Sequence, residues 1–207
     1  MDAATEAARP ISRRVWNGTV AGGLVGPADE GYTASGAPNE VSTTVALLTA
    51  PPEPFVPEPM QGRPALGILA CHCGDAAADP GPGAAAFAPL RSAVPPDVDL
   101  IQPLPYAALQ QLLDASAPRG MRGYWKPGFL SGLPEGLIDT LVGQAQAAPS
   151  PLSAIHLHQV GGAVRDFDER TSPFGHRDAA FAVNIMGMWP EPAEDAANTR
   201  WAQESWA

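Results

Sequence analysis

The chain is short of positive charge. Of its 207 residues, 12 are basic and 22 are acidic, so the formal net charge is −10, and Lys126 is the only lysine. An acidic protein repels phosphate backbones, and nucleic-acid binding is therefore not expected. Charged residues of both signs make up only 16% of the chain and hydrophobic residues 45%, a balance that favours a buried core over disorder.

Long apolar runs and a cysteine framework are also missing. No stretch of about 18 apolar residues occurs, so the sequence predicts no membrane-spanning helix. The N-terminus lacks the basic region and the apolar stretch of a secretory signal. The two cysteines, Cys71 and Cys73, do not make a disulfide framework. Together these absences favour a cytoplasmic location, with no membrane among the partners.

Proline and glycine, by contrast, are abundant, with 24 and 21 residues, so many loops are expected. Residues 1–38 show little periodicity and read as a loop-rich N-terminal segment, whereas 39–207 carry the patterns of one folded domain. Apolar and β-branched patterns predict strands at 41–50, 65–73, 123–130, 153–160 and 179–189, with a short extended segment at 98–104. Helical periodicity predicts helices at 84–91, 105–115, 133–147 and 193–206.

This order of elements predicts an α+β fold, with an antiparallel sheet and helices packed on one of its faces. The first two strands are expected to pair antiparallel across the proline-rich loop between them. Pro127 cannot donate a hydrogen bond to a neighbouring strand, so the segment 123–130 is expected at an edge of the sheet. The face without helices is then free to be covered by another group.

The segment 155–163 carries the most suggestive chemistry. Its alternation predicts a strand with Ile155, Leu157 and Gln159 on one face and His156, His158 and Val160 on the other. Two imidazoles on one face could transfer protons near neutral pH. Gly161 and Gly162 follow at once, and glycine at such a place marks a turn, a bulge or a close approach by a ligand. A hairpin strand with solvated histidines and a Gly-Gly turn is the alternative interpretation.

Cys71, Cys73, His156 and His158 could together form a zinc site if their strands lie close, because each pair shares a strand face. The Cys-x-Cys spacing is not that of a zinc knuckle, however. Small buried cysteines are the favoured interpretation, and no metal is expected.

Two further places carry isolated charge. Tyr124 and Lys126 share a strand face and could contact an anion or a cofactor, although a lysine whose stem packs at a sheet edge is an equal alternative. Arg177 could bind a carboxylate or a phosphate, or form a structural salt bridge. No Ser/His/Asp grouping and no phosphate-binding glycine loop stands out.

A set of stretches along the chain forms an ordered pattern: 39–44, 103–106 with Gln110 and Asp114, 120–126, 152–163 ending in Gly-Gly-Ala, 171–177, Trp189, and 201–202. In this order they resemble the C-terminal, substrate-binding half of the berberine-bridge-enzyme-like FAD-linked oxidases, within the vanillyl-alcohol-oxidase superfamily. The stretch 171–177 is similar to that family's Thr-Ala-Phe-x-His-Arg pattern. The resemblance covers about 165 residues, in the order that the family has.

The resemblance implies a sheet whose helix-free face lies over a flavin ring. A base on this sheet would take a proton from the substrate while hydride passes to the flavin. The residues in matching positions are His158, as base or orienting residue, with His156, Tyr124 and Gln159. Gly161, Gly162, Lys126 and Arg177 are expected to face the substrate or the cofactor.

The resemblance also implies that the flavin domain is mostly missing. Residues 13–18 and 26–32 are similar to the opening of the family's FAD-binding domain, but in reverse order, so 1–38 could be a remnant of it. The family's closing Tyr-x-Asn motif is absent, and Gln203 stands where an arginine is common. We therefore expect an incomplete member that is inactive alone.

Two functions follow as hypotheses. The first is the substrate-binding domain of an FAD-dependent oxidoreductase acting on an alcohol, a sugar or an alkaloid-like substrate, in association with a flavin domain. The second is a non-catalytic α+β remnant that forms homodimers or binds a partner through the uncovered sheet face, since a large exposed apolar face predicts association.

Overall fold

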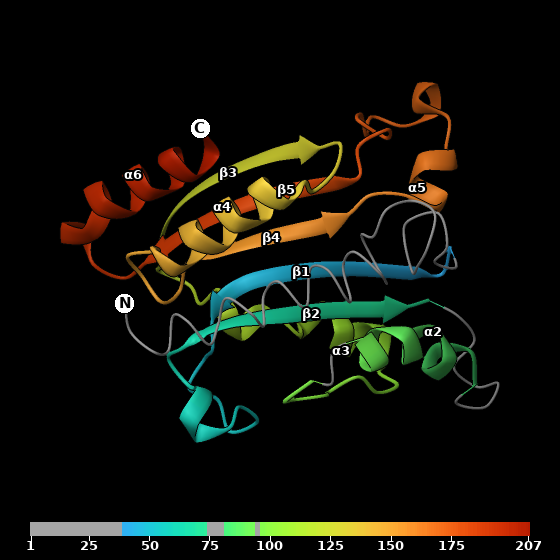
Figure 1. The fold of residues 1–207 in the computed structure, drawn as a ribbon, viewed down its shortest axis with the longest axis horizontal. Helices are drawn as coiled ribbons and strands as arrows, with labels where there is room; N and C mark the ends of the chain where they lie inside the picture. Colours follow the sequence, from blue (N-terminus) through green and yellow to red (C-terminus); the bar gives the residue numbers. More distant parts are fainter. Residues whose placement is uncertain (1–38, 74–80, 94–95) are drawn as a thin grey trace.

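The fold is an α+β arrangement built on one antiparallel sheet, as the sequence predicts (Figure 1). The computed structural model describes residues 39–73, 81–93 and 96–207, and the predictions for 1–38 lie outside these residues. Five strands pair in the order β2-β1-β4-β5-β3, and every pairing is antiparallel. The strands are β1 (Val41–Thr49), β2 (Pro64–His72), β3 (Arg122–Leu130), β4 (Ala154–Gln159) and β5 (Phe181–Trp189).

The helices fall mostly where apolar periodicity places them. They are α2 (Gly81–Ala93), α3 (Tyr106–Gln111), α4 (Glu135–Gln146), α5 (Ala163–Asp166) and α6 (Asp195–Trp206), with short 3₁₀ turns at Glu58–Met60, Asp114–Ser116, Glu169–Thr171 and Pro192–Glu194. None of the helices within the described ranges is long and apolar enough to cross a bilayer.

Two predictions about the sheet are confirmed by its pairing. β1 pairs with β2 across the proline-rich loop, with Val45 opposite Ile68. β3 lies at an edge and pairs only with β5, so the missing N–H of Pro127 leaves no gap in a central ladder. The histidine-bearing strand β4 lies at the centre of the sheet, between β1 and β5.

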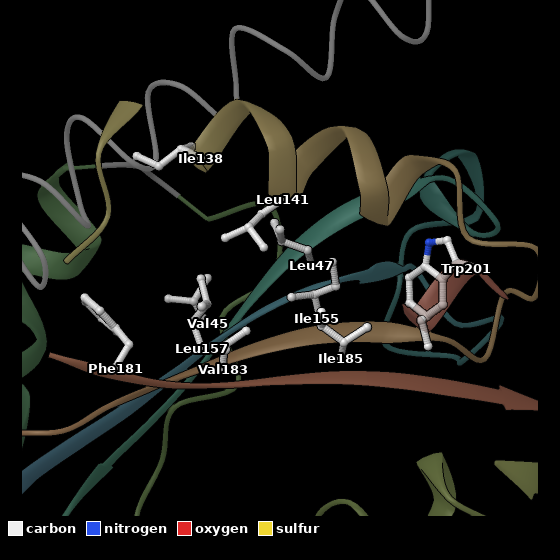
Figure 2. Close-up of a cluster of buried hydrophobic side chains, with 11 residues drawn as sticks. Val45, Leu47, Ile138, Leu141, Ile155, Leu157, Phe181, Val183, Ile185 and Trp201 are labelled. Atoms are coloured by element: carbon white, nitrogen blue, oxygen red, sulfur yellow. The ribbon is translucent and has the colours of Figure 1, made fainter. Parts of the chain in front are cut away.

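Helices α4 and α6 cover one face of the sheet and bury the core there. The core cluster consists of Val45, Leu47, Ile138, Leu141, Ile155, Leu157, Phe181, Val183, Ile185, Trp201 and Ala202 (Figure 2). The Nε1 of Trp201 donates a hydrogen bond of 2.8 Å to the carbonyl oxygen of Gln144, which joins α6 to α4. Burial of each large aliphatic side chain contributes about 1.5–3 kcal/mol. This energy holds the aliphatic residues of each strand against the helices, so the residues that alternate with them lie on the opposite face.

The segment between α2 and α3 differs from its prediction. Residues 98–104 form no strand, and Pro103 and Pro105 leave little of the backbone able to pair with a sheet. The helix expected at 105–115 ends as α3 at Gln111, and a separate 3₁₀ turn follows. Its apolar stripe is exposed at Tyr106, Leu112 and Leu113 rather than packed on the sheet.

Candidate functional site

The face of the sheet opposite α4 and α6 is called here the open face. Residues that pair directly across neighbouring strands share a face, so the register identifies its members. They are Ala65, Gly67, Leu69 and Cys71 on β2; Ser42, Thr44, Ala46 and Leu48 on β1; Ala154, His156 and His158 on β4; Ala182, Asn184, Met186 and Met188 on β5; and Gly123, Trp125, Pro127 and Phe129 on β3. None of these strand residues is an Asp, Glu, Lys or Arg.

His156 and His158 lie side by side on this face, as the alternation predicts. Their ring centroids are 5.9 Å apart, with the ring planes at 69°. The Nδ1 of His158 is 2.9 Å from the hydroxyl oxygen of Thr44, a residue on the neighbouring strand β1. This hydrogen bond fixes the orientation of the ring and leaves Nε2 as the nitrogen that can act on a ligand.

Both imidazoles are held in the neutral form. Burial lowers the pKa of His156 below its usual value, and the proximity of His158 lowers it further. Burial also lowers the pKa of His158. Desolvation disfavours the charged imidazolium, so near neutral pH each ring keeps an unprotonated nitrogen that can accept a hydrogen bond or a proton.

Three of the expected site residues do not join the histidines. Gln159 lies on the helix-covered face, where its Oε1 accepts a hydrogen bond of 2.8 Å from the hydroxyl of Thr43. Tyr124 lies on that face too, and its hydroxyl oxygen is 3.4 Å from Nε2 of Gln203 on α6. The Lys126 ammonium is 5.6 Å from the ring centroid of Trp206, also on α6.

The residues that the resemblance groups at one flavin-facing wall therefore lie on both faces of the sheet. The histidines lie on the open face, and Gln159 and Tyr124 lie on the helix-covered face, where the alternation along β4 also places Gln159. The physical reason is that β3 and β4 each place alternate residues on the two faces, and helix packing decides which set is covered. On β3 the set with Tyr124 and Lys126 meets α6, so Trp125 and Phe129 point to the open face.

The two glycines end β4. The structure assigns the strand only to Gln159, and Val160 is buried rather than exposed beside the histidines. Gly162 has a φ of 50°, and a Cβ at this position would lie 2.9 Å from Oδ1 of Asn39. The local backbone therefore requires glycine at this position, where the chain leaves the sheet and enters α5. Gly161 accepts the hydrogen bond of Val164 in the same turn.

Arg177 is buried in the long connection between β4 and β5. Its guanidinium donates a 2.6 Å hydrogen bond to the carbonyl oxygen of Val164. It also lies 5.2 Å from the ring centroid of Phe167 and 5.3 Å from that of Phe174. These contacts hold the loop beside the end of the open face, and a contact of Arg177 with substrate or cofactor stays a prediction.

Cys71 and Cys73 lie together at the end of β2, with their sulfur atoms 3.6 Å apart, and both are free thiols. Within the described ranges, no three His, Cys, Asp or Glu side chains gather closely enough to hold a metal ion. The two cysteines and the two histidines belong to strands separated by β1, so they do not assemble into the zinc set considered above.

A hollow of about 440 Å³ lies at the start of β3, away from the row of His158. Its lining consists of Gly120, Met121, Arg122, Gly123, Tyr124, Trp189, Asp195 and Thr199. Arg122 and Asp195 form an ion pair of 2.5 Å inside this lining, and Nε1 of Trp189 donates to the same carboxylate at 2.7 Å. The charges there neutralise each other, and the hollow lies where β3, β5 and α6 meet.

Sequence reasoning missed three residues of the open face that bear on its chemistry: Thr44, Asn184 and Phe129. Alternation along β3 would have grouped Phe129 with Trp125, but it could not say which set meets the helices. The contact of Thr44 with His158 depends on the register of β1 against β4, and no local pattern carries that register.

Comparison with known proteins gives the following similarities. No protein-family model matches the sequence. An FAD-linked oxidoreductase of Dictyostelium discoideum is 26% identical over 111 residues, which are 53% of this chain and 25% of that protein. The structure of BBE-like #28 from Arabidopsis thaliana aligns over 98% of this chain and 39% of its own, at 16% identity and a TM-score of 0.59.

Two further solved structures agree. Aclacinomycin oxidoreductase aligns over 94% of this chain and 37% of its own, at 18% identity and a TM-score of 0.58. A berberine bridge enzyme variant described as a reticuline dehydrogenase aligns over 98% of this chain and 37% of its own, at 14% identity and a TM-score of 0.60. The resemblance is confirmed at the level of the fold: this chain has the fold of part of the berberine-bridge-enzyme-like FAD-linked oxidases, and it spans well under half of their length.

Proposed function

We propose that this chain is the substrate-binding part of an FAD-dependent oxidoreductase that acts on an alcohol, a sugar or an alkaloid-like substrate. The observation that carries the proposal is the pair of neutral imidazoles on the open face of a sheet with this fold. His158 is the proposed base, and His156 is the second imidazole beside it on the same face.

The open face fits a ring but not the phosphates of FAD. Its strand residues carry no charge, and they include the exposed aromatic side chains Trp125 and Phe129. A diphosphate needs cationic side chains or converging backbone N–H groups, which these strand residues do not supply. The flavin diphosphate would therefore be held by another part of the complete enzyme, with only ring atoms near this face.

The proposed chemical role of His158 is to accept the proton of a substrate hydroxyl. In the required tautomer, Nδ1–H donates to the hydroxyl oxygen of Thr44, and Nε2 presents its lone pair to the substrate. The lowered pKa keeps this lone pair available near neutral pH. FAD, when bound, supplies a hydride acceptor for the carbon that bears the hydroxyl.

The experiment is titration of the full chain with riboflavin, which has the ring of FAD but no diphosphate. The chain has four histidines, so their ring signals can be followed individually by NMR. We expect His156 and His158 to shift and Trp125 fluorescence to be quenched, while His72, which lies on the other face of β2, stays unchanged. Equal shifts at His72, or no shift at His156 and His158, would contradict the proposal.

A second function has a specific observation in its favour. Large apolar side chains are exposed along the segment that follows α2, among them Leu100 at 56% and Tyr106 at 73%. A module that dimerises or binds a partner protein without catalysis would bury such residues. Sedimentation equilibrium of the full chain, together with the riboflavin titration, separates the two functions. A tight homodimer that does not bind riboflavin favours this second function.

A further inference from the structure

One row of the open face joins a proton acceptor to an aromatic surface. The row crosses four strands by direct pairing: Thr44 on β1, His158 on β4, Ala182 on β5 and Phe129 on β3. His158 and Phe129 are therefore two strand spacings apart, roughly 10 Å. The strand residue between them is Ala182, whose side chain is the smallest that a non-glycine residue can carry, so no large side chain of the sheet separates the imidazole from the aromatic ring.

Phe129 belongs to a preformed group of rings, called here the aromatic ledge and made of Phe129, Phe174 and His176. The ring of His176 stacks on Phe129, with centroids 4.5 Å apart and planes at 26°. Phe174 meets Phe129 edge-on, at 6.2 Å and 83°. Phe129 and Phe174 are each 42% exposed, so the ledge presents ring surface to solvent.

The backbone and a buried cation hold the ledge in place. His176 has a φ of 56°, a conformation that residues other than glycine rarely adopt and that the surrounding contacts must maintain. Arg177 lies next to it in sequence and is buried, with its guanidinium 5.3 Å from the ring centroid of Phe174 and bonded to the carbonyl of Val164. A surface of rings that is fixed before binding loses little conformational entropy when a ligand arrives.

We propose that the open face binds a planar aromatic alcohol or phenol of at least two fused rings, with its ring system against the aromatic ledge and its hydroxyl donating to Nε2 of His158. This inference rests on the proposed function, because it takes the open face as the substrate surface. It narrows the ligand class to hydroxylated polycyclic aromatics and excludes sugars. The substrates among these ligands are the alcohols with a hydrogen on the carbon that bears the hydroxyl, because a phenol has no hydride to transfer and serves only as a binding probe.

The chemistry of the face favours this class over a sugar. Carbohydrate binding requires many hydrogen-bond donors and acceptors to match several hydroxyls. The polar side chains of the open face are few, namely Ser42, Thr44, His156, His158 and Asn184, and Thr44 is already bonded to His158. An uncharged face with exposed rings instead suits an uncharged ligand that stacks, because ring–ring contacts add stabilisation beyond the burial of area.

The test measures binding of three probes to the full chain by NMR and calorimetry. β-Naphthol has both the ring system and the hydroxyl; its methyl ether lacks the donor; decahydro-β-naphthol keeps the hydroxyl but has no aromatic ring. We expect β-naphthol to bind most tightly, with shifts at His158 and His176. Equal affinity for the saturated alcohol would overturn the role of the ledge.

Two variants assign the contacts. Phe129→Leu keeps an apolar side chain but removes the ring, and we expect β-naphthol to bind about twofold to tenfold more weakly to it. Phe55→Leu is the matched control, because Phe55 is 50% exposed in the loop between β1 and β2, and its variant should bind as the unaltered protein does. The proposal would be overturned if both variants lost the same affinity for β-naphthol, or if neither variant lost affinity.

The hydroxyl contact has its own readout. In the unaltered protein β-naphthol should bind severalfold more tightly than its methyl ether, whereas in His158→Leu, which has no acceptor, the two should bind alike. A preference that survives in His158→Leu would place the hydroxyl elsewhere and overturn the proposed pose. None of these probes involves flavin, so failure of riboflavin to bind with success of β-naphthol would reject the proposed oxidoreductase function and leave the aromatic site standing.

Discussion

The indole ring of Trp206 lies directly against the backbone of Gly128. A Cβ built on Gly128 would overlap Cη2 and Cζ3 of this indole, so only glycine leaves room for the ring on this part of β3. The same indole lies 5.6 Å from the ammonium of Lys126, and it closes α6 over the edge of the sheet. The last side chain of α6 is thus matched to one glycine on the edge strand.

Gly128→Ala is therefore predicted to push Trp206 off the sheet and to destabilise the fold by about 1–3 kcal/mol, the usual range for overpacking. Urea unfolding followed by tryptophan fluorescence measures the change. Gly132→Ala is the control, because nothing lies within 4 Å of the Cβ it would add. In a protein that already carries Trp206→Ala, the further change Gly128→Ala should cost little stability, because the ring that the new Cβ would overlap is gone. A Gly128→Ala protein as stable as Gly132→Ala would contradict the contact.

Acid should destabilise the fold through the two histidines of the open face. Their pKa values are lowered in the folded state, so the unfolded chain binds protons more readily. The stabilisation that comes from keeping them neutral is complete above the ordinary histidine pKa of about 6.5 and is lost as the pH falls through the lower folded values.

Urea unfolding at a pH above 7 and again near pH 5 tests this expectation. The free energy of unfolding should fall less on acidification in His156→Gln and His158→Gln than in the unaltered protein. Asn184→Ala, a change on the same face that removes no titratable group, should lose as much stability on acidification as the unaltered protein does. If all three variants lose the same stability as the unaltered chain, the two imidazoles are not the groups that titrate.

How far the sequence predicts this site can be seen on β3 and β4. The alternation of Ile155, His156, Leu157 and His158 is strong enough to assign each to its face, because large aliphatic residues must be buried. On β3 both alternating sets contain aromatic residues, so local pattern does not say whether Tyr124 or Trp125 meets α6. That choice depends on helix packing from a distant part of the chain.

The segment after α2 shows a second limit. The spacing of Tyr106, Leu109, Leu112 and Leu113 is that of a packed helix, yet only Leu109 is partly buried. An apolar stripe has the same period whether it packs within its own domain or against another surface. Periodicity alone could not therefore distinguish a core helix from an exposed one.

The two cysteines are predicted to differ in reactivity. Burial raises the pKa of the Cys71 thiol, and its contact with Cys73 raises it further. Cys73 is exposed, whereas Cys71 is only partly so. Because the thiolate is the reactive form, iodoacetamide near pH 8 should alkylate the two thiols in separate phases, with Cys73 first.

Single variants identify each phase. Cys73→Ser should remove the fast phase, and the remaining Cys71 should still react slowly, because burial is the largest cause of its raised pKa. Cys71→Ser should remove the slow phase. A fast reaction of Cys71 in the Cys73→Ser protein would show that its contact with Cys73, rather than burial, controls its reactivity.

The core face should account for far more stability than the exposed apolar residues. Leu157 is 1% exposed at the centre of the sheet, and its truncation would leave a cavity between β4 and the helices, so Leu157→Ala is expected to lower the free energy of unfolding by about 2–5 kcal/mol. Leu100→Ala makes the same chemical change at a residue that is 56% exposed, and it should alter stability by about 0.5 kcal/mol or less. Urea unfolding of the two variants at one protein concentration measures both values. A large loss in Leu100→Ala that shrinks on dilution would instead mean that Leu100 is buried against a second copy of the chain, since the unaltered protein also loses an intermolecular contact when it dissociates.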